Sequence, residues 1–236
     1  MRLDKYLADT GAFSRKDAGR VIRSGRVTVG GVCMRDPAAK VDENDPEPII
    51  SVDGVPVRWT KYKYVMLNKP ADYVSTTDDD PKSVMKLLPP EFTRLEMFPC
   101  GRLDVDTVGL LLITNDGPTA HELLSPKHHR EKTYRFRCLP IDSGMKERLE
   151  SGIVLSDFTS KPCTVQLDDA ENGTITVTEG KYHQIKRMFH AVGSEILYLE
   201  RLTFAGLTLD RTLERGEWRE LTDTEIAILR GDEKIQ

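Results

Sequence analysis

The densest group of residues able to do chemistry lies in Gly101–Leu110, which reads GRLDVDTVGL. An apolar run follows directly, so Asp104, Asp106 and Thr107 are expected on a turn that enters a buried strand, a position suited to reactive groups. In an extended backbone the two carboxylates would face the same way, as paired carboxylates or metal ligands do. In a turn they can equally diverge, with Asp106 capping the turn and Asp104 paired to Arg102. Spacing alone leaves both interpretations open.

A second group lies in 178–190, which reads TEGKYHQIKRMFH. A glycine before a predicted helix, followed by the adjacent cations Lys186 and Arg187, is typical of a helix N-terminus that faces an anion. His183 and His190 are seven positions apart and could share a face. Because no acidic or sulfur partner stands nearby, we do not expect these histidines to bind a metal.

A third group is Lys132-Thr133-Tyr134, at the head of a predicted strand. It lies within 127–137, which holds five basic residues and one acidic residue. A tyrosine among cations is suited to stacking on a base beside a phosphate contact, although sheet packing is the commoner role of a strand tyrosine. Together the three groups predict an RNA-facing site near Asp104 and do not name a reaction.

The charge of the chain is unevenly distributed. The net charge of the 236 residues is −4, yet residues 1–35 carry a net +5 and residues 36–53 a net −5. Local basic patches on an acidic chain indicate a polyanion bound at defined places, the alternative being solvated helix and strand faces. The sequence has no apolar run of the roughly 18–20 residues that span a bilayer, and its start lacks the pattern of a secretory signal. With four cysteines and no Cys-x-x-Cys pair, we expect free thiols, no metal and a cytoplasmic protein.

The N-terminal residues predict a small helix-helix-strand domain over 1–57, followed by a linker over 58–62. A short helix over 3–8 precedes a second one that Ser14 caps and Gly25 ends. On the second helix Lys16, Arg20 and Arg23 share one face. The pairs Gly30-Gly31 and Asp53-Gly54 predict tight turns between short strands.

Residues 63–236 predict a larger domain in which strands outnumber helices and do not alternate regularly with them. This pattern favours an α+β fold with a mainly antiparallel sheet. Strands are expected at 64–70, within 103–114, and at 132–138, 163–168, 174–178 and 197–204. Helices are expected near 118–124, 142–151, 182–192 and 222–230.

Several of these segments resemble the motifs of the RluA/RsuA superfamily of pseudouridine synthases. The resemblance rests on GRLDVDTVGLLLITNDG at 101–117, EKTY at 131–134, GKYHQIKR at 180–187 and the pair Lys69-Pro70. Residues 1–57 resemble an S4 RNA-binding domain, which RsuA-type members carry at the N-terminus. The strings HHREKTY and TSKP are most similar to the RsuA branch, which acts on small-subunit ribosomal RNA.

The resemblance implies a role for each matched position. Asp104 matches the catalytic aspartate, and Tyr134 matches the tyrosine that stacks on the target base. Ile185 falls where the family places an apolar residue beneath that base. Lys186 stands where many relatives have an arginine paired to the catalytic carboxylate, and lysine lacks the bidentate fork of arginine. Arg102 matches an arginine thought to fill the space of the flipped nucleotide or to hold its phosphate.

The implied reaction is the isomerisation of one uridine to pseudouridine in ribosomal RNA, without a cofactor. The uridine implied is number 516 of 16S rRNA, with a 23S rRNA uridine as the alternative. Covalent attack and proton abstraction by Asp104 both stay open. Rival interpretations are a non-catalytic rRNA-binding assembly factor and a carboxylate-based nucleosidase or metal-dependent hydrolase. We expect a monomer whose other RNA contacts are Arg15, Lys16, Arg20, Arg23, Lys132 and Arg187.

Overall fold

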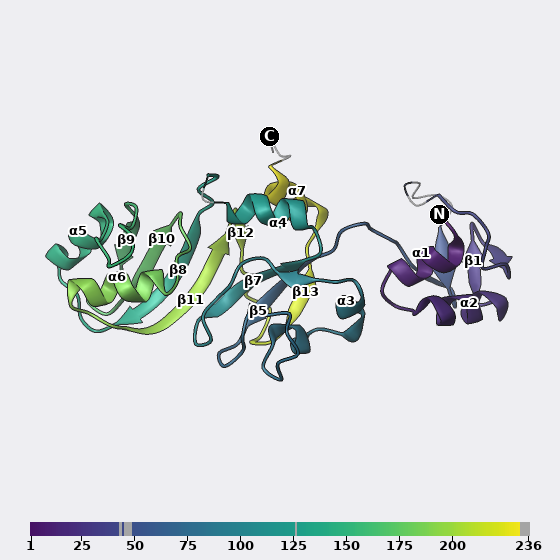
Figure 1. The fold of residues 1–236 in the computed structure, drawn as a ribbon, viewed down its shortest axis with the longest axis horizontal. Coiled ribbons are helices and arrows are strands. Elements are labelled where there is room, and N and C mark those ends of the chain that lie inside the picture. The colour runs from purple at the N-terminus through teal and green to yellow at the C-terminus, as the bar shows by residue number, and fades with distance from the viewer. Residues whose placement is uncertain (43, 45–48, 126, 232–236) are drawn as a thin grey trace. The chain divides into compact units, whose positions relative to one another are not determined.

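The computed structural model describes residues 1–42, 44, 49–125 and 127–231 (Figure 1). They form two compact units. The first comprises Met1–Lys63 and Pro89–Met97, and the second comprises Tyr64–Leu88 and the chain from Phe98 onward. This division groups Pro89–Met97, which the sequence analysis gave to the larger domain, with the first unit.

The first unit has the elements that its caps and turns predict. The helices α1 (Leu3–Asp9) and α2 (Arg15–Arg23) precede the short strands β1 (Val27–Val29), β2 (Val32–Met34), β3 (Ile50–Val52) and β4 (Val55–Pro56). The strands form an antiparallel sheet in the order β2-β1-β3-β4. Ser14 caps α2 by accepting a hydrogen bond from the Asp17 amide at 3.1 Å. Gly30 and Gly31 both have positive φ, as a two-residue hairpin turn requires.

The two helices of this unit bury apolar side chains against its small sheet. Leu3 and Leu7 of α1, Ile22 of α2 and Val27 of β1 are all fully buried. The predicted basic face of α2 is exposed on the opposite side of the helix. The helix therefore separates a packing face from a face of cations, as its periodicity predicts.

The second unit is built on a nine-stranded sheet. Its strands are β5 (Tyr64–Lys69), β6 (Phe98–Pro99), β7 (Val108–Thr114), β8 (Lys132–Cys138), β9 (Thr164–Leu167), β10 (Asn172–Val177), β11 (Ile196–Phe204), β12 (Leu207–Thr208) and β13 (Trp218–Glu220). The main order is β13-β5-β7-β11-β8-β10-β9, with β6 beside β7 and β12 beside β11. Every pairing is antiparallel except that of β7 with β11. The prediction of an α+β fold with a mainly antiparallel sheet is confirmed.

The helices of this unit fall where the sequence predicts them. They are α4 (Gly117–Leu124), α5 (Ser143–Ser151), α6 (Gln184–Val192) and α7 (Asp223–Arg230). The side chains of Asp116, Asp142 and Thr222 cap α4, α5 and α7. A 3₁₀ helix at Val84–Leu87 and the short α3 (Pro90–Arg94), which belongs to the first unit, were not predicted. No helix of the described residues is long and apolar enough to cross a membrane.

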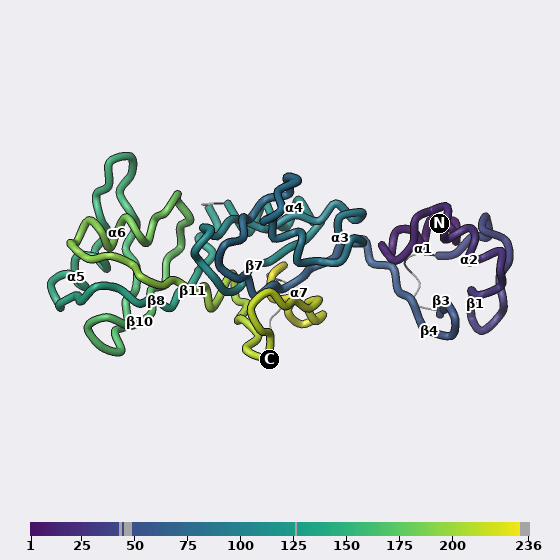
Figure 2. The backbone as a smooth tube through the Cα atoms, turned by 90° about the horizontal axis from the view of Figure 1, so that it is seen from below, coloured from purple at the N-terminus to yellow at the C-terminus, as the bar shows by residue number. Residues whose placement is uncertain are grey.

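The strand β11 joins the two ends of the large sheet (Figures 1 and 2). The helices α5 and α6 lie at the end formed by β8–β10, and α4 and α7 lie at the end formed by β5, β7 and β13. The parallel pairing of β7 with β11 is short and includes the pair Gly109–Arg201. A Cβ atom on Gly109, whose φ is +98°, would lie 2.4 Å from the Arg201 carbonyl oxygen. This close approach of two backbones requires glycine at position 109.

Candidate active site

The loop over 101–107 enters β7 and carries Asp104; we call it the Asp104 loop. Residues 104–107 form a turn in which the Thr107 amide donates to the Asp104 carbonyl at 3.1 Å. The buried Ser75 hydroxyl accepts from the Leu103 amide and donates to the Leu103 carbonyl, both at 3.1 Å. The backbone on either side of Asp104 is therefore fixed by local and long-range hydrogen bonds.

The fully buried side chain of Lys69, at the end of β5, binds the backbone of the same loop. Its ammonium donates to the carbonyl oxygens of Asp104 and Val105 at 3.1 Å and of Thr107 at 2.9 Å. A fourth hydrogen bond goes to Pro70 at 3.0 Å. Burial lowers the pKa of Lys69 to about 8. At pH 7 the group is still mostly protonated, and its three N–H groups are shared among the four oxygens.

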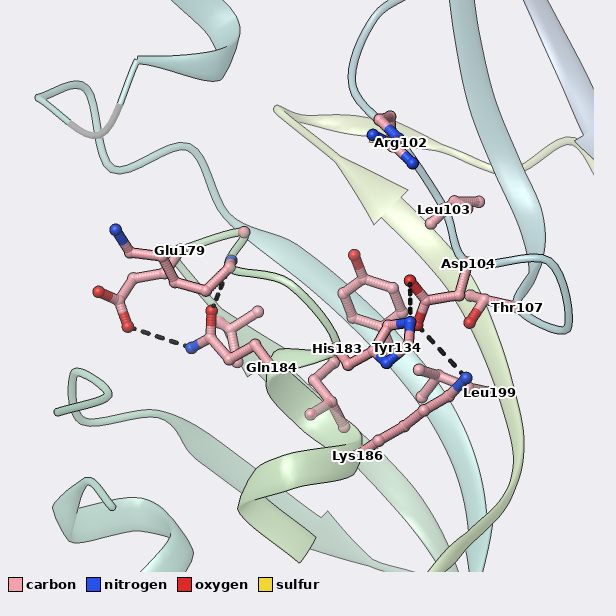
Figure 3. A pocket seen from close by; sticks show the side chains of 14 residues that line it. Arg102, Leu103, Asp104, Thr107, Tyr134, Glu179, His183, Gln184, Lys186 and Leu199 are labelled. Atoms are coloured by element: carbon pink, nitrogen blue, oxygen red, sulfur yellow. Dashed lines mark hydrogen bonds and ion pairs between the residues drawn. The ribbon is translucent and has the colours of Figure 1, made fainter. Parts of the chain in front are cut away.

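Lys186 bridges the two carboxylates of the loop, and its contact with Asp104 is drawn in Figure 3. Its Nζ lies 3.3 Å from Oδ2 of Asp104 and 2.5 Å from Oδ1 of Asp106. Burial alone would raise the pKa of Asp106, but the hydrogen bond and charge of Lys186 outweigh it and lower that pKa. Among the ion pairs of the described residues, none joins Asp104 to Arg102, so the pairing weighed above is replaced by one with Lys186. The two carboxylates face the same cation.

His183 approaches Asp104 as well, which the sequence analysis missed. Its Nε2 lies 3.6 Å from Oδ1 of Asp104. The residue precedes α6 in a left-handed conformation with φ +49°, and its ring stacks on that of Tyr182 at 3.8 Å between centroids. Positive φ is uncommon for a residue other than glycine. The unusual backbone directs the imidazole toward a carboxylate 79 positions earlier in the chain, a contact that no local pattern announces.

An open pocket lies beside the Asp104 carboxylate, and apolar side chains form one part of its wall. Tyr134 of β8 and Ile185 of α6 line it and are 8% and 6% exposed. Leu199 of β11 lies with them, and Arg102 stands at the side of the pocket (Figure 3). The structure thus brings together all five residues that the sequence placed at the reaction centre, counting Asp104 and Lys186. The pocket has flat apolar surfaces next to a carboxylate and a cation.

The residues expected to contact RNA elsewhere are scattered. Arg15, Lys16, Arg20 and Arg23 belong to α2 in the first unit, with Arg15 3.7 Å from Asp4 and Arg20 3.3 Å from Asp17. Arg187 forms an ion pair with Asp157, which raises the pKa of Arg187. Lys132 is buried rather than exposed, and its ammonium donates to the Arg130 carbonyl at 3.0 Å. The described residues contain no group of three His, Cys, Asp or Glu side chains that could hold a metal ion.

Comparison with known proteins supplies the family. Residues 63–191 match the family described as RNA pseudouridylate synthase. The chain belongs to this family. Residues 1–46 of this synthase match the S4 domain. A solved structure titled "Crystal structure of pseudouridylate synthase" superposes with a TM-score of 0.68 and 35% identity, covering 97% of this chain and 99% of that one.

Two relatives extend the match over nearly the whole length of the synthase. An uncharacterized RNA pseudouridine synthase of Bacillus subtilis is 42% identical, over 97% of this chain and 98% of its own. Ribosomal small subunit pseudouridine synthase A of Escherichia coli K12 is 41% identical, over 96% of this chain and 99% of its own. The RsuA-type resemblance inferred from the motifs is thereby confirmed, and the protein is an RNA pseudouridine synthase.

Proposed function

We propose that this synthase isomerises a single uridine of small-subunit ribosomal RNA, uridine 516 of 16S rRNA, with Asp104 as its catalytic carboxylate. The observation that carries the proposal is the Asp104 carboxylate, 27% exposed, beside a pocket walled by Tyr134 and Ile185. The carboxylate is open to a substrate, while its backbone is fixed by Lys69 and Ser75. Relatives named for action on the small ribosomal subunit support the choice of RNA.

The reaction breaks the bond from C1′ of the ribose to N1 of uracil and rejoins the ring through C5. The base must leave its stack to reach the carboxylate and must then be held while it is detached. Tyr134 and Ile185 offer apolar surfaces on which the uracil can turn without escaping. No group is added or removed overall, so the side chains present are sufficient for the atom balance.

Asp104 has two chemical routes, and both start from the ionised carboxylate. It can attack C1′ and displace the uracil, or it can remove a proton from the sugar. Lys186 at 3.3 Å stabilises the negative charge that either route requires. His183 lies 3.6 Å from the other oxygen of the same carboxylate, which is 27% exposed and so can be reached by a substrate.

Recognition of the RNA is proposed to involve the S4 domain. Lys16, Arg20 and Arg23 are exposed on one face of α2, where they can contact phosphates without competing with the packing face. Arg15 completes the cluster at the start of the helix. RNA contacts by Arg187 and Lys132 stay predictions. Arg187 is already ion-paired to Asp157, and Lys132 is buried.

The catalytic assignment is tested by Asp104→Asn with Asp106→Asn as its matched control. Both substitutions remove one carboxylate from the same loop and from the same lysine, but only Asp104 borders the pocket. Tritium release from 5-tritiated uridine in a 16S rRNA transcript measures turnover. We expect no detectable release by Asp104→Asn, unchanged RNA affinity, and a loss below about tenfold for Asp106→Asn. Turnover by a folded Asp104→Asn protein at the wild-type rate would refute the assignment.

The target is tested in cells that lack the protein. Carbodiimide treatment and primer extension map pseudouridines in 16S and 23S rRNA. Loss of a single stop at uridine 516, restored by wild type and not by Asp104→Asn, is the expected result. A missing stop in 23S rRNA would move the target to the large subunit, and no missing stop would favour an assembly factor. Release of free uracil, or inhibition by a chelator, would favour the nucleosidase or hydrolase interpretation.

A further inference from the structure

A second cavity adjoins the active-site pocket within the second unit. Its volume is about 290 Å³, well above the roughly 10–15 Å³ that one water needs. It shares Arg102 and Tyr134 with the active-site pocket, and its other lining includes Lys132, Lys161 and Arg201. The lining is therefore strongly basic and continuous with the place where the uridine is proposed to bind.

Two of the lining cations are buried and form no ion pair with the residues that the structure describes. Lys132 is 8% exposed and Arg201 is 2% exposed. Within the described chain, neither takes part in a salt bridge, and both lie over the ring of Phe204, at 5.7 Å and 4.9 Å from its centroid. Buried charges in proteins are normally paired, because removing an ion from water is costly. A pair of neighbouring buried cations is an arrangement that an anion would complete.

The hydrogen bonds of these cations are also incomplete. Arg201 donates from Nε to the Leu110 carbonyl at 2.7 Å, but its buried Nη2 has no hydrogen-bond partner among the described residues. Lys132 donates one of its three N–H groups to the Arg130 carbonyl. Unsatisfied buried donors mark a missing partner in many native structures. Here the missing partner must be an acceptor, since both groups only donate.

The acidic residue of the lining does not supply that acceptor. Glu179 accepts from the Lys161 amide at 2.8 Å and from Nε2 of Gln184 at 3.1 Å, both on its Oε2 atom. Burial and the nearby charge of Arg201 lower the pKa of Lys132 to about 8, and Glu179 offsets this only in part. The cavity therefore keeps an excess of positive charge.

We propose that this cavity is a phosphate site, in which Lys132 and Arg201 bind a phosphodiester of the RNA next to the flipped uridine. The proposal rests on the proposed function for the source of the phosphate. Phosphate oxygens would accept from Lys132 Nζ and from the guanidinium of Arg201, with Arg102 in the lining that the two pockets share. The anion would anchor the backbone while Tyr134, in the common wall, contacts the base.

The anion site is tested first without RNA. Thermal unfolding is followed for wild type, Lys132→Met and the control Lys146→Met with increasing inorganic phosphate, at constant ionic strength set by chloride. Lys146 lies on α5 and pairs with Glu150 away from the cavity. We expect a saturable rise of the melting temperature for wild type and Lys146→Met, and none for Lys132→Met. Equal rises in all three proteins, or no rise in wild type, would overturn the site.

The source of the phosphate is tested by binding. In the Asp104→Asn background, which removes turnover, the affinity is measured for a 16S rRNA fragment with single neutral methylphosphonates beside the target uridine. One position should weaken binding about tenfold with Lys132 present and not with Lys132→Met, because a charge-assisted hydrogen bond is lost. Lys132→Arg should restore the sensitivity. If phosphate stabilises the wild type but no position discriminates, the RNA assignment is wrong and the cavity binds free phosphate.

These experiments separate the phosphate site from the proposed function. Neither arm measures turnover, so a failure of Asp104→Asn to abolish activity would leave the anion result standing. Conversely, equal loss of RNA affinity by Asp104→Asn with and without Lys132→Met at every methylphosphonate would refute the phosphate contact while the catalytic assignment holds. Circular dichroism of Lys132→Met serves as the folding control, and loss of a buried charge beside Arg201 should not lower its stability.

Discussion

Replacement of Lys69 by methionine would separate the stability of the fold from the order of the Asp104 loop. Methionine keeps an unbranched side chain, one atom shorter than lysine, and removes all donors. Two of the four carbonyls keep another hydrogen bond, since Asp104 accepts from the Thr107 amide and Val105 from the Asp72 amide. At about 1–2 kcal/mol for each of the other two carbonyls, which lose the lysine as their partner, the loss is about 2–4 kcal/mol.

The opposing effect is of similar size. A pKa of about 8 in place of 10.5 means that the buried charge costs up to about 3 kcal/mol at pH 7, at about 1.36 kcal/mol per pH unit. Methionine removes this cost. We therefore expect the free energy of unfolding at pH 7 to stay within about 2 kcal/mol of wild type. Turnover should fall at least about 100-fold, because the loop that carries Asp104 is no longer fixed and misplacement by about 1 Å costs that much.

Urea unfolding and tritium release measure the two effects, with the exposed Lys86→Met as the control. The sign of the pH effect follows from the pKa of Lys69, which is higher in the unfolded chain than in the fold. Between about pH 8 and pH 10.5 the unfolded chain binds more protons, so wild-type stability gains from this group as pH rises. Lys69→Met should lack that gain, while Lys132, whose pKa is also about 8, contributes to both proteins. Wild-type turnover by Lys69→Met, or identical pH dependence of stability, would refute the reasoning.

Three further predictions concern the fold and RNA binding. Gly109→Ala should cost more than about 4 kcal/mol in urea unfolding, because its Cβ would lie 2.4 Å from a carbonyl of β11; a loss below 1 kcal/mol would contradict the close approach. Hydrogen bonds from Thr212 lower the pKa of Asp210 to about 2. Its stabilisation is present above about pH 4 and lost as pH falls toward 2, so Asp210→Asn should flatten that part of an acid titration followed by circular dichroism. The double variant Lys16→Gln/Arg20→Gln should reduce the slope of RNA affinity against salt by about 1–2, and an unchanged slope would exclude phosphate contact there.

The sequence predicted the Asp104 loop because its signals are local. A turn-forming polar segment followed by a continuous apolar run reads as a loop entering a buried strand, and all seven residues of β7 are buried. The contacts that hold and surround Asp104 are different in kind. Lys69 lies 35 positions before it and His183 lies 79 positions after it, and only the tertiary fold brings them together. No local pattern indicates that Lys69 is fully buried or that His183 takes a left-handed conformation.

The burial of Lys132 could have been predicted from the sequence. The burial of β8 alternates, and Lys132 lies two residues before Tyr134, so the two share the buried face. An interpretation of 127–137 by charge alone overlooks this alternation of buried and exposed residues. The short helix α3 had a signal as well, since Pro90 at its first position is typical of a helix start. A helix of five residues is, however, too short to show an apolar periodicity.

The pairing of β11 fixes how far apart the two strands beside the pocket lie. On one side Arg201 pairs with Gly109 of β7, just after the Asp104 loop, and on the other it pairs with Tyr134 of β8. The backbones of Gly109 and Tyr134 thus stand two strand spacings apart, about 9.6 Å, a distance set by the main-chain hydrogen bonds of the sheet. Side-chain changes can alter which RNA is admitted without altering this spacing. Substitutions at the edge of the pocket can therefore change RNA specificity, while the distance between the strands beside it stays fixed by the sheet.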